Sequence, residues 1–166
     1  MIGINQADFD DIFKNLYVPI RNFIYYKSGN VEFSEDIAQD AFLKIWEKRE
    51  EIRPETVKQL LYTTANNLFL NKLERQKVSF NFRSSFKNDK LAESPEFELE
   101  MKEFDARLQT AIASLDDKKR TVFLMNRIDK LTYWQIAESL DITVKAVEKR
   151  MEKALAFLKK EINMNI

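Results

Sequence analysis

Apolar residues recur at steps of three or four along almost the whole chain, and this helical period constrains the fold more than any other feature. No stretch sustains the alternation of apolar and polar residues that a half-buried strand needs. Glycine and proline, which interrupt helices, occur only two and three times in 166 residues. The sequence therefore predicts an all-α protein.

Three helices are predicted in the first half of the chain, over residues 8–26, 34–48 and 56–76. The first is expected to be ended by Ser28, Gly29 and Asn30. Ser34 is the expected N-cap of the second, because a serine oxygen accepts a free N–H of the first helical turn. Pro54 lies in the loop before the third. Each helix has one apolar side, so together they predict a small N-terminal domain over residues 5–77.

Between residues 78 and 103 the helical pattern dissolves into a stretch that begins rich in Ser, Asn and Lys and becomes acidic downstream. This composition predicts a flexible linker. A second small domain is predicted over residues 104–162, with helices at residues 104–113, 117–127, 133–140 and 144–161. The predicted fold is therefore two small helical domains joined by a flexible linker.

Residues 131–151, LTYWQIAESLDITVKAVEKRM, contain two short apolar periods around a three-residue joint. Thr132 with Gln135 predicts a capping box, and Thr143 offers the N-cap of a second helix. The two helix starts are so close that the helices must meet at a steep angle, with Ala137 small enough for close approach. The C-terminal domain is therefore predicted to contain a helix-turn-helix.

The second helix of this pair has a basic face opposite its apolar one. Residues 143–160 hold six Lys or Arg and two Glu, and Lys145, Lys149 and Lys153 recur every four residues. A helix about 10–12 Å wide fits a major groove about 12 Å wide, where phosphates attract the lysines. We interpret the pair as a DNA-reading element. The alternative that the pattern leaves open is an ordinary helical hairpin with solvated lysines.

Composition excludes several kinds of chemistry. The chain has no Cys and no His, so zinc sites, disulfides, thiol nucleophiles and histidine bases are absent, and neither glycine lies in a phosphate-binding loop. We expect no enzyme activity, no cofactor and no small-molecule substrate. No segment approaches the roughly 18 apolar residues of a membrane span, and the start of the chain lacks the features of a signal peptide. We therefore expect a cytoplasmic protein without direct membrane insertion.

Three segments carry a resemblance to a known family: SEDIAQDAFLKIW at residues 34–46, LLYTTANNL at 60–68, and residues 115–125 with the helix-turn-helix that follows. On these, the whole chain resembles the extracytoplasmic-function (ECF) group of bacterial sigma-70 family RNA polymerase sigma factors. The resemblance implies an alternative sigma factor that binds core polymerase and directs promoter recognition and transcription initiation. The first domain would be like sigma region 2 and the second like region 4.

The implied partners are core RNA polymerase, through its β′ clamp helices and β flap, promoter DNA, and an anti-sigma factor as inhibitor. The residues implied at the polymerase are Asp36, Gln39, Asp40, Phe42 and Trp46. Helix aromatics are usually core residues, so Phe42 and Trp46 could instead serve packing. Two other functions stay open: a free-standing helix-turn-helix transcriptional regulator, and an all-α adaptor that binds only protein.

The resemblance also implies two DNA-binding sets. For the minus-ten element these are Arg53, Thr56, Lys58, Gln59, Tyr62, Thr63, Asn66 and Asn67; for the minus-thirty-five element they are Thr143, Lys145, Lys149, Arg150 and Lys153. Amides, hydroxyls and an aromatic ring suit flipped bases, because they can pair with base edges or stack once the strands separate. The open alternative for Asn66 and Asn67 is a solvated polar helix face.

Four residues depart from the family pattern. Leu60 replaces the usual tryptophan, Asn71 an aspartate, Asp141 the glycine of the turn, and Glu148 a common lysine. Asp tolerates the left-handed backbone of such a turn better than most residues. These departures affect the expected promoter preference rather than the expected mode of binding.

Overall fold

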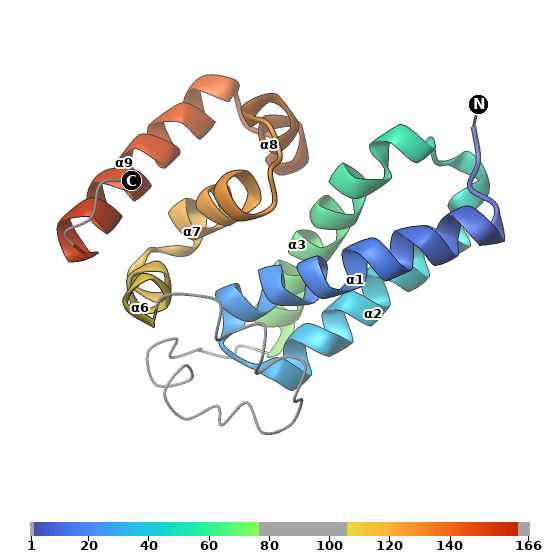
Figure 1. The fold of residues 1–166 in the computed structure, drawn as a ribbon, viewed down its shortest axis with the longest axis horizontal. Coiled ribbons are helices and arrows are strands. Elements are labelled where there is room, and N and C mark those ends of the chain that lie inside the picture. The colour runs from blue at the N-terminus through green and yellow to red at the C-terminus, as the bar shows by residue number, and fades with distance from the viewer. Residues whose placement is uncertain (1, 77–105, 163–166) are drawn as a thin grey trace.

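The computed structural model describes residues 2–76 and 106–162, and these ranges form helices and loops without a strand (Figure 1). The all-α prediction is confirmed. The N-terminal group consists of α1 (Gln6–Ser28), α2 (Val31–Glu47) and α3 (Val57–Gln76). The C-terminal group consists of α6 (Ala106–Ser114), α7 (Asp117–Phe123), α8 (Tyr133–Leu140) and α9 (Val144–Ile162). The predicted linker over residues 78–103 lies outside the described residues.

The join between α1 and α2 explains where both helices end and begin. Gly29 adopts a left-handed backbone with φ of 69°, and its N–H donates to the carbonyl of Tyr25, which is a common way to close a helix. The Asn30 side chain then accepts the Phe33 N–H at 2.8 Å and caps α2. The prediction that Ser34 caps this helix is wrong. Ser34 lies in the first turn, and its buried hydroxyl donates to the Val31 carbonyl at 2.7 Å.

The three N-terminal helices pack around a core that α1, α2 and α3 all supply. Ile24, Ile37 and Leu61 are fully buried in it, one from each helix. Burying a side chain of this size contributes on the order of 1.5–3 kcal/mol. The apolar sides predicted for these three segments therefore face one another, as expected.

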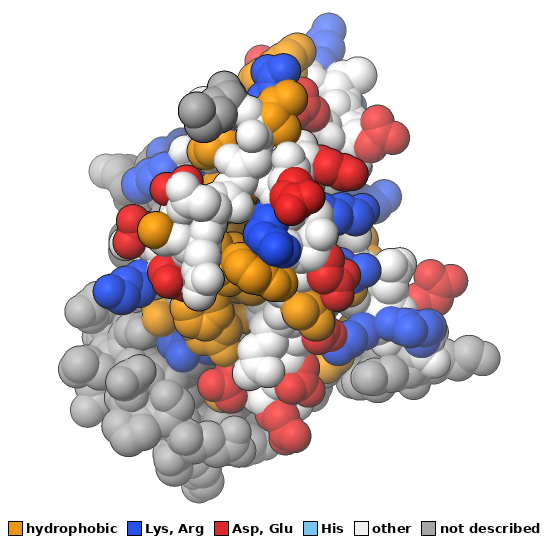
Figure 2. Space-filling model, turned by 90° about the vertical axis from the view of Figure 1, so that its right-hand side faces the viewer, with side chains coloured by type: hydrophobic (Ala, Val, Ile, Leu, Met, Phe, Trp, Pro, Cys, Tyr) orange, Lys and Arg blue, Asp and Glu red, His pale blue; other side chains and the backbone are white. Residues whose placement is uncertain are grey.

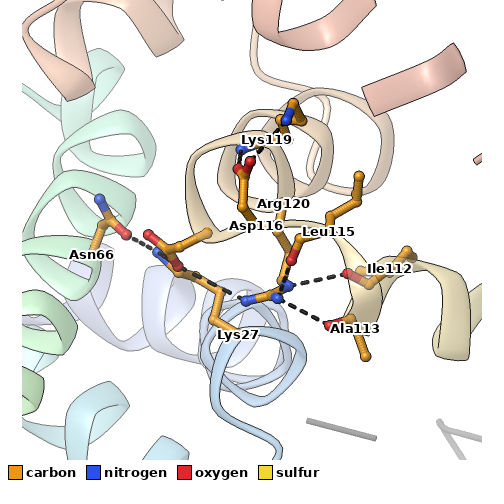
Figure 3. Close-up of polar contacts among 9 residues, drawn as sticks. Lys27, Asn66, Ile112, Ala113, Leu115, Asp116, Lys119 and Arg120 are labelled. Carbon is orange, nitrogen blue, oxygen red and sulfur yellow. Dashed lines mark hydrogen bonds and ion pairs between the residues drawn. The ribbon is translucent and has the colours of Figure 1, made fainter. Parts of the chain in front are cut away.

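The helix predicted over residues 117–127 is present, but it changes from an α-helix to a π-helix along its length. After α7, residues Leu124–Ile128 form a π-helical turn, in which the Asp129 N–H donates to the Leu124 carbonyl at 3.0 Å. Arg120 lies in α7, and its buried guanidinium donates to three carbonyls that precede this helix, those of Ile112, Ala113 and Leu115 (Figure 3). Ile112 and Ala113 lie in the last turn of α6 and Leu115 directly follows it, so Arg120 caps this end of the helix. The Ile112 carbonyl also accepts the Leu115 N–H at 3.1 Å.

The helix-turn-helix prediction is confirmed, and so are the caps predicted for its two helices. Thr132 and Gln135 form the capping box, and Thr143 accepts the Ala146 N–H at 3.0 Å at the start of α9. Asp141 turns the chain with φ of 55° and ψ of 49°, the left-handed region. Ile136 and Val147 are fully buried where the two helices meet.

The two groups of helices lie against each other. α3 packs on α8, and the end of α1 packs on α6 and α7, so α3 runs between the α1–α2 pair and the C-terminal helices (Figure 1). The side chains along α3 therefore meet partners from both halves of the chain.

Candidate polymerase and DNA interfaces

An apolar groove lies between α1 and α2. It has a volume of about 410 Å³ and is lined by Gln6, Phe9, Asp10, Phe13, Gln39, Phe42, Leu43 and Trp46. Leu43 and Phe13 keep 53% and 41% of their surface exposed. On the face of the molecule that carries the start of α1, hydrophobic side chains gather among charged ones (Figure 2). Exposed apolar surface of this kind commonly marks a protein-binding site.

Aromatic rings form the floor and one end of the groove. The Phe9 and Trp46 rings lie 5.0 Å apart, as do those of Phe13 and Phe42, and the Arg49 guanidinium lies 3.8 Å from the Trp46 ring. Phe42 is only 3% exposed, so its main role is packing, whereas Trp46 is half-buried and lines the groove. The two aromatics predicted together thus have different environments.

The polar residues predicted for the polymerase follow the same side of α2. Asp36 and Gln39 are exposed, and Asp40 is half-buried with its carboxylate 3.0 Å from the Lys72 amine. Leu43, one turn beyond Gln39, also belongs to this surface and was missed in the sequence. The sequence feature that indicates Leu43 is an apolar residue that lies outside the buried face of an amphipathic helix.

The residues predicted to read melted bases lie along and just before α3, but they differ in accessibility. Arg53, Thr56 and Asn67 are exposed, while Lys58, Gln59 and Thr63 are half-buried. Tyr62 is fully buried and Asn66 is 4% exposed. The structure therefore places most of these residues on α3, but only some of their side chains are accessible.

The hidden members are bonded to other parts of the chain. Lys58 donates to the backbone carbonyl of Asp129 at 2.7 Å, and the Tyr62 hydroxyl donates to the Asp129 carboxylate at 2.6 Å. Gln59 donates to the Glu138 carboxylate at 2.7 Å. All three acceptors lie in the C-terminal group of helices, which the sequence spacing could not indicate.

The carboxyl of Asp129 has an unusual pKa because it is buried. Burial raises the pKa of its carboxyl to about 7, although the Tyr62 hydrogen bond and the positive charge of Lys58 both act to lower it. Burial and the neighbouring carboxylate also raise the pKa of Tyr62, so this phenol stays protonated and acts as a donor.

Lys27 joins α1, α3 and α7 from a fully buried position. Its ammonium donates to the Asn66 side-chain oxygen (Figure 3) and lies 3.3 Å from the Asp117 carboxylate. The same ammonium sits 4.6 Å from the centre of the Phe69 ring. Burial lowers the pKa of Lys27 to about 8, and the Asp117 charge opposes this shift. Asn66 is thus held by the protein itself.

The residues predicted for duplex DNA lie on the helix-turn-helix. Thr143, Lys145, Lys149 and Lys153 are exposed at the start and along one face of α9, and Glu148 is exposed beside them. Arg150 is half-buried and instead lines a pocket between α3 and the C-terminal helices. The structure therefore groups the lysines and separates Arg150 from them.

Two further properties concern the described ranges alone. Among residues 2–76 and 106–162, no cluster of three or more acidic, histidine or cysteine side chains could hold a metal ion. In the same part of the chain, no helix is both long and apolar enough to cross a membrane.

Comparison with known proteins gives consistent results over both groups of helices. Residues 5–78 match the family Sigma-70 region 2, and residues 105–158 match Sigma-70, region 4. The chain is 27% identical over 163 residues to the RNA polymerase sigma factor YlaC of Bacillus subtilis, covering 95% of this chain and 94% of that protein. It is 28% identical over 167 residues to the ECF RNA polymerase sigma factor SigW of the same organism, covering 94% and 88%.

Solved structures agree with this fold. The sigma factor RpoE of Bartonella quintana, solved with the anti-sigma factor NepR, matches with a TM-score of 0.72 at 15% identity, over 96% of this chain and 99% of that one. CnrH, solved with the cytosolic domain of CnrY, matches with a TM-score of 0.69 at 21% identity, over 96% and 90%. With both conserved regions matched in their order along the chain, this protein belongs to the sigma-70 family of RNA polymerase sigma factors, in its ECF group.

Proposed function

We propose that this protein is an alternative sigma factor that binds core RNA polymerase through the groove between α1 and α2. The observation that carries this proposal is the apolar groove lined in part by exposed Gln39, with exposed Asp36 one turn before it on α2. Apolar contact area supplies affinity, while a polar rim sets the orientation of the partner. The expected partner surface is the β′ clamp helices.

The two halves of the chain divide the reading of the promoter. The side chains of α3 bind bases of the melted minus-ten element, and the lysine face of α9 binds duplex DNA at the minus-thirty-five element. The C-terminal domain also contacts the β flap. The protein makes no covalent bond in this role, acts in the cytoplasm where polymerase and promoter meet, and is inhibited by an anti-sigma factor.

The polymerase contact can be tested with a double substitution on the rim of the groove. Asp36→Arg with Gln39→Ala should weaken the capture of core polymerase at least about tenfold, since it reverses one charge and removes one amide at the contact. Glu74→Arg, an exposed charge reversal on α3, is the matched control and should bind like the unchanged protein. Equal capture by all three proteins would contradict the proposal.

The upstream contact can be tested at Lys149, which is exposed in the middle of the lysine face. Lys149→Ala should weaken the binding of holoenzyme to a duplex that carries the upstream element. If the amine meets a phosphate, the salt dependence of log K should fall by about one unit; if it meets a base, sequence preference should relax. Lys159→Ala, near the end of the same helix, serves as the control.

The same assays separate the remaining alternative. A free-standing helix-turn-helix regulator would bind its duplex tightly without polymerase. The sigma factor proposed here needs core polymerase to open a promoter, which a promoter-opening assay with and without core enzyme detects.

A further inference from the structure

A short segment before α1 is hydrogen-bonded to the connection between α2 and α3, and the two lie side by side (Figure 1). The Gly3 N–H donates to the Ile52 carbonyl at 2.8 Å, and the Ile4 N–H donates to the Arg49 carbonyl at 2.9 Å. These bonds hold residues 3–5, the N-terminal segment, against the middle of the connection.

Backbone conformation and burial fix the N-terminal segment in place. Gly3 has φ of 107°, which residues with a Cβ atom rarely adopt, and a Cβ atom there would lie only 3.4 Å from the Glu50 carbonyl oxygen. Ile4 is 4% exposed and belongs to the hydrophobic core. Asn5 then caps α1 with its side chain. A glycine, a buried apolar side chain and a helix cap thus anchor three successive residues.

The α2–α3 connection, residues 48–56, consists largely of two short 3₁₀ turns, Arg49–Glu51 and Pro54–Thr56. Within the described residues 2–76, neither turn begins with a side-chain cap. Short 3₁₀ turns have poorer hydrogen-bond geometry than α-helices, so contacts from outside contribute more to their shape. The N-terminal segment supplies two such contacts, directly before Arg53.

Arg53 and Thr56 are the residues of this connection that were predicted to bind melted bases, and both are exposed. The Thr56 hydroxyl donates to the Arg53 carbonyl at 3.0 Å, which ties the two residues together. Binding side chains discriminate best when their support holds them within about 0.5 Å of the productive geometry. Contacts that fix the connection before a base arrives therefore favour discrimination between bases.

We propose that the N-terminal segment is a positioning element for the minus-ten reader, because it holds the α2–α3 connection in the arrangement in which Arg53 and Thr56 select bases. This inference rests on the proposed binding of melted bases. Gly3 and Ile4 act through the connection and do not themselves touch DNA. Loosening the segment therefore relaxes base preference at the positions that the connection reads, rather than lowering affinity at every position alike.

Two substitutions loosen the segment in different ways. Gly3→Ala places a Cβ atom on a residue with φ of 107°, and Ile4→Ala removes most of a buried side chain. On its N-terminal side the lining of the apolar groove begins at Gln6, so both variants should capture core polymerase like the unchanged protein.

Base preference is measured with holoenzyme assembled from core polymerase and the full-length protein. The probe is a pool of forked DNA molecules whose upstream duplex and single-stranded overhang are both randomised, and the bound molecules are sequenced. Arg53→Ala and Thr56→Ala identify the positions that the connection reads. At these positions Gly3→Ala and Ile4→Ala should weaken the preference at least about threefold, part of the roughly tenfold discrimination that one good base contact supplies. Preference at the other positions should not change.

Two matched variants and a second measurement serve as controls. Ile2→Ala changes a side chain that is 60% exposed just before the segment, and should leave every preference unchanged. Ile4→Val keeps a branched apolar side chain and should retain the preference that Ile4→Ala loses. In the free protein, amide hydrogen exchange over residues 48–56 should be faster in Gly3→Ala and Ile4→Ala, while exchange in α2 stays the same.

The outcomes separate positioning from the proposed function. If Arg53→Ala relaxes a position that neither Gly3→Ala nor Ile4→Ala affects, positioning is overturned and the proposed function stands. An equal loss of affinity at every position would assign the segment to stability alone, which also overturns positioning. If Arg53→Ala and Thr56→Ala change no preference while polymerase capture is intact, the connection does not read bases, and positioning fails with that role.

Discussion

Asp129 accepts two hydrogen bonds from α3 across the contact between the two groups of helices, since its carboxylate accepts from Tyr62 and its carbonyl accepts from Lys58. A buried carboxylate is costly when charged, which is why its pKa rises from 3.8 to about 7. The Tyr62 hydroxyl can donate to the carboxyl in either state. The contact between the two groups of helices therefore depends on the protonation state of Asp129, and so on pH.

The pH dependence follows from the direction of this shift. Because the folded-state pKa is raised, the stability that neutral Asp129 contributes is complete below pH 3.8 and is lost as the pH rises through about 7. Between pH 5.5 and 8 the free energy of unfolding should fall by up to about 2 kcal/mol from this group. Urea unfolding at the two pH values measures the change.

The control for this prediction is Asp129→Asn, which keeps a side-chain oxygen for Tyr62 but cannot titrate. Its free energy of unfolding should change less between pH 5.5 and 8 than that of the unchanged protein. Identical pH profiles for the two proteins would show that Asp129 is charged at both pH values and contributes nothing to the difference.

At the scale of elements, local sequence signals predicted helix ends correctly where only one nearby residue could act as the cap. Thr132 and Thr143 cap their helices as predicted, because each is followed directly by a helical apolar pattern. Ser34 failed because Asn30, directly after the left-handed Gly29, caps α2 one turn earlier. The π-helical turn over Leu124–Ile128 could not be predicted, since its i to i+5 bonds have no composition signal.

The predicted site residues differ in the same way, because local signals account for some of their environments and contacts with distant segments account for others. Exposure of Asp36 and Gln39 followed from their polarity on an amphipathic helix. Burial of Tyr62 and Asn66 did not follow, because their partners Asp129 and Lys27 come from other segments of the chain, which the spacing along α3 does not encode. The sequence therefore placed the proposed base readers on one helix, but could not indicate what covers it.

The turn of the helix-turn-helix makes a prediction at this scale. Asp141 has φ of 55°, which strains every residue with a Cβ atom, although aspartate less than most. Asp141→Gly should raise the free energy of unfolding by roughly 0.5–1 kcal/mol, because glycine adopts this conformation freely and its larger loss of chain entropy offsets only part of the gain. Asp141→Ala should lower it by roughly 1 kcal/mol. Urea denaturation gives both values, and a reversed order would mean that Asp141 is not strained.

At the scale of the whole molecule, the proposed surfaces are arranged so that they can act in sequence. The groove lies between α1 and α2, whereas the covered face belongs to α3 and meets α8. The lysine face of α9 is exposed in the same structure. The molecule thus exposes its proposed polymerase groove and duplex-binding face, while several of its proposed base readers are covered.

This arrangement predicts that the groove and the contact between the two groups of helices can be changed independently. Leu43→Asp places a charge on a leucine that is 53% exposed at the groove, and should weaken polymerase capture about tenfold to a hundredfold. Asp129→Ala with Glu138→Ala removes two acceptors of α3 side chains at the contact between the helix groups. The effects of the two changes on polymerase binding should add within about 0.5 kcal/mol, as for sites without shared partners. A larger deviation in titrations of core polymerase would show that the two surfaces are coupled.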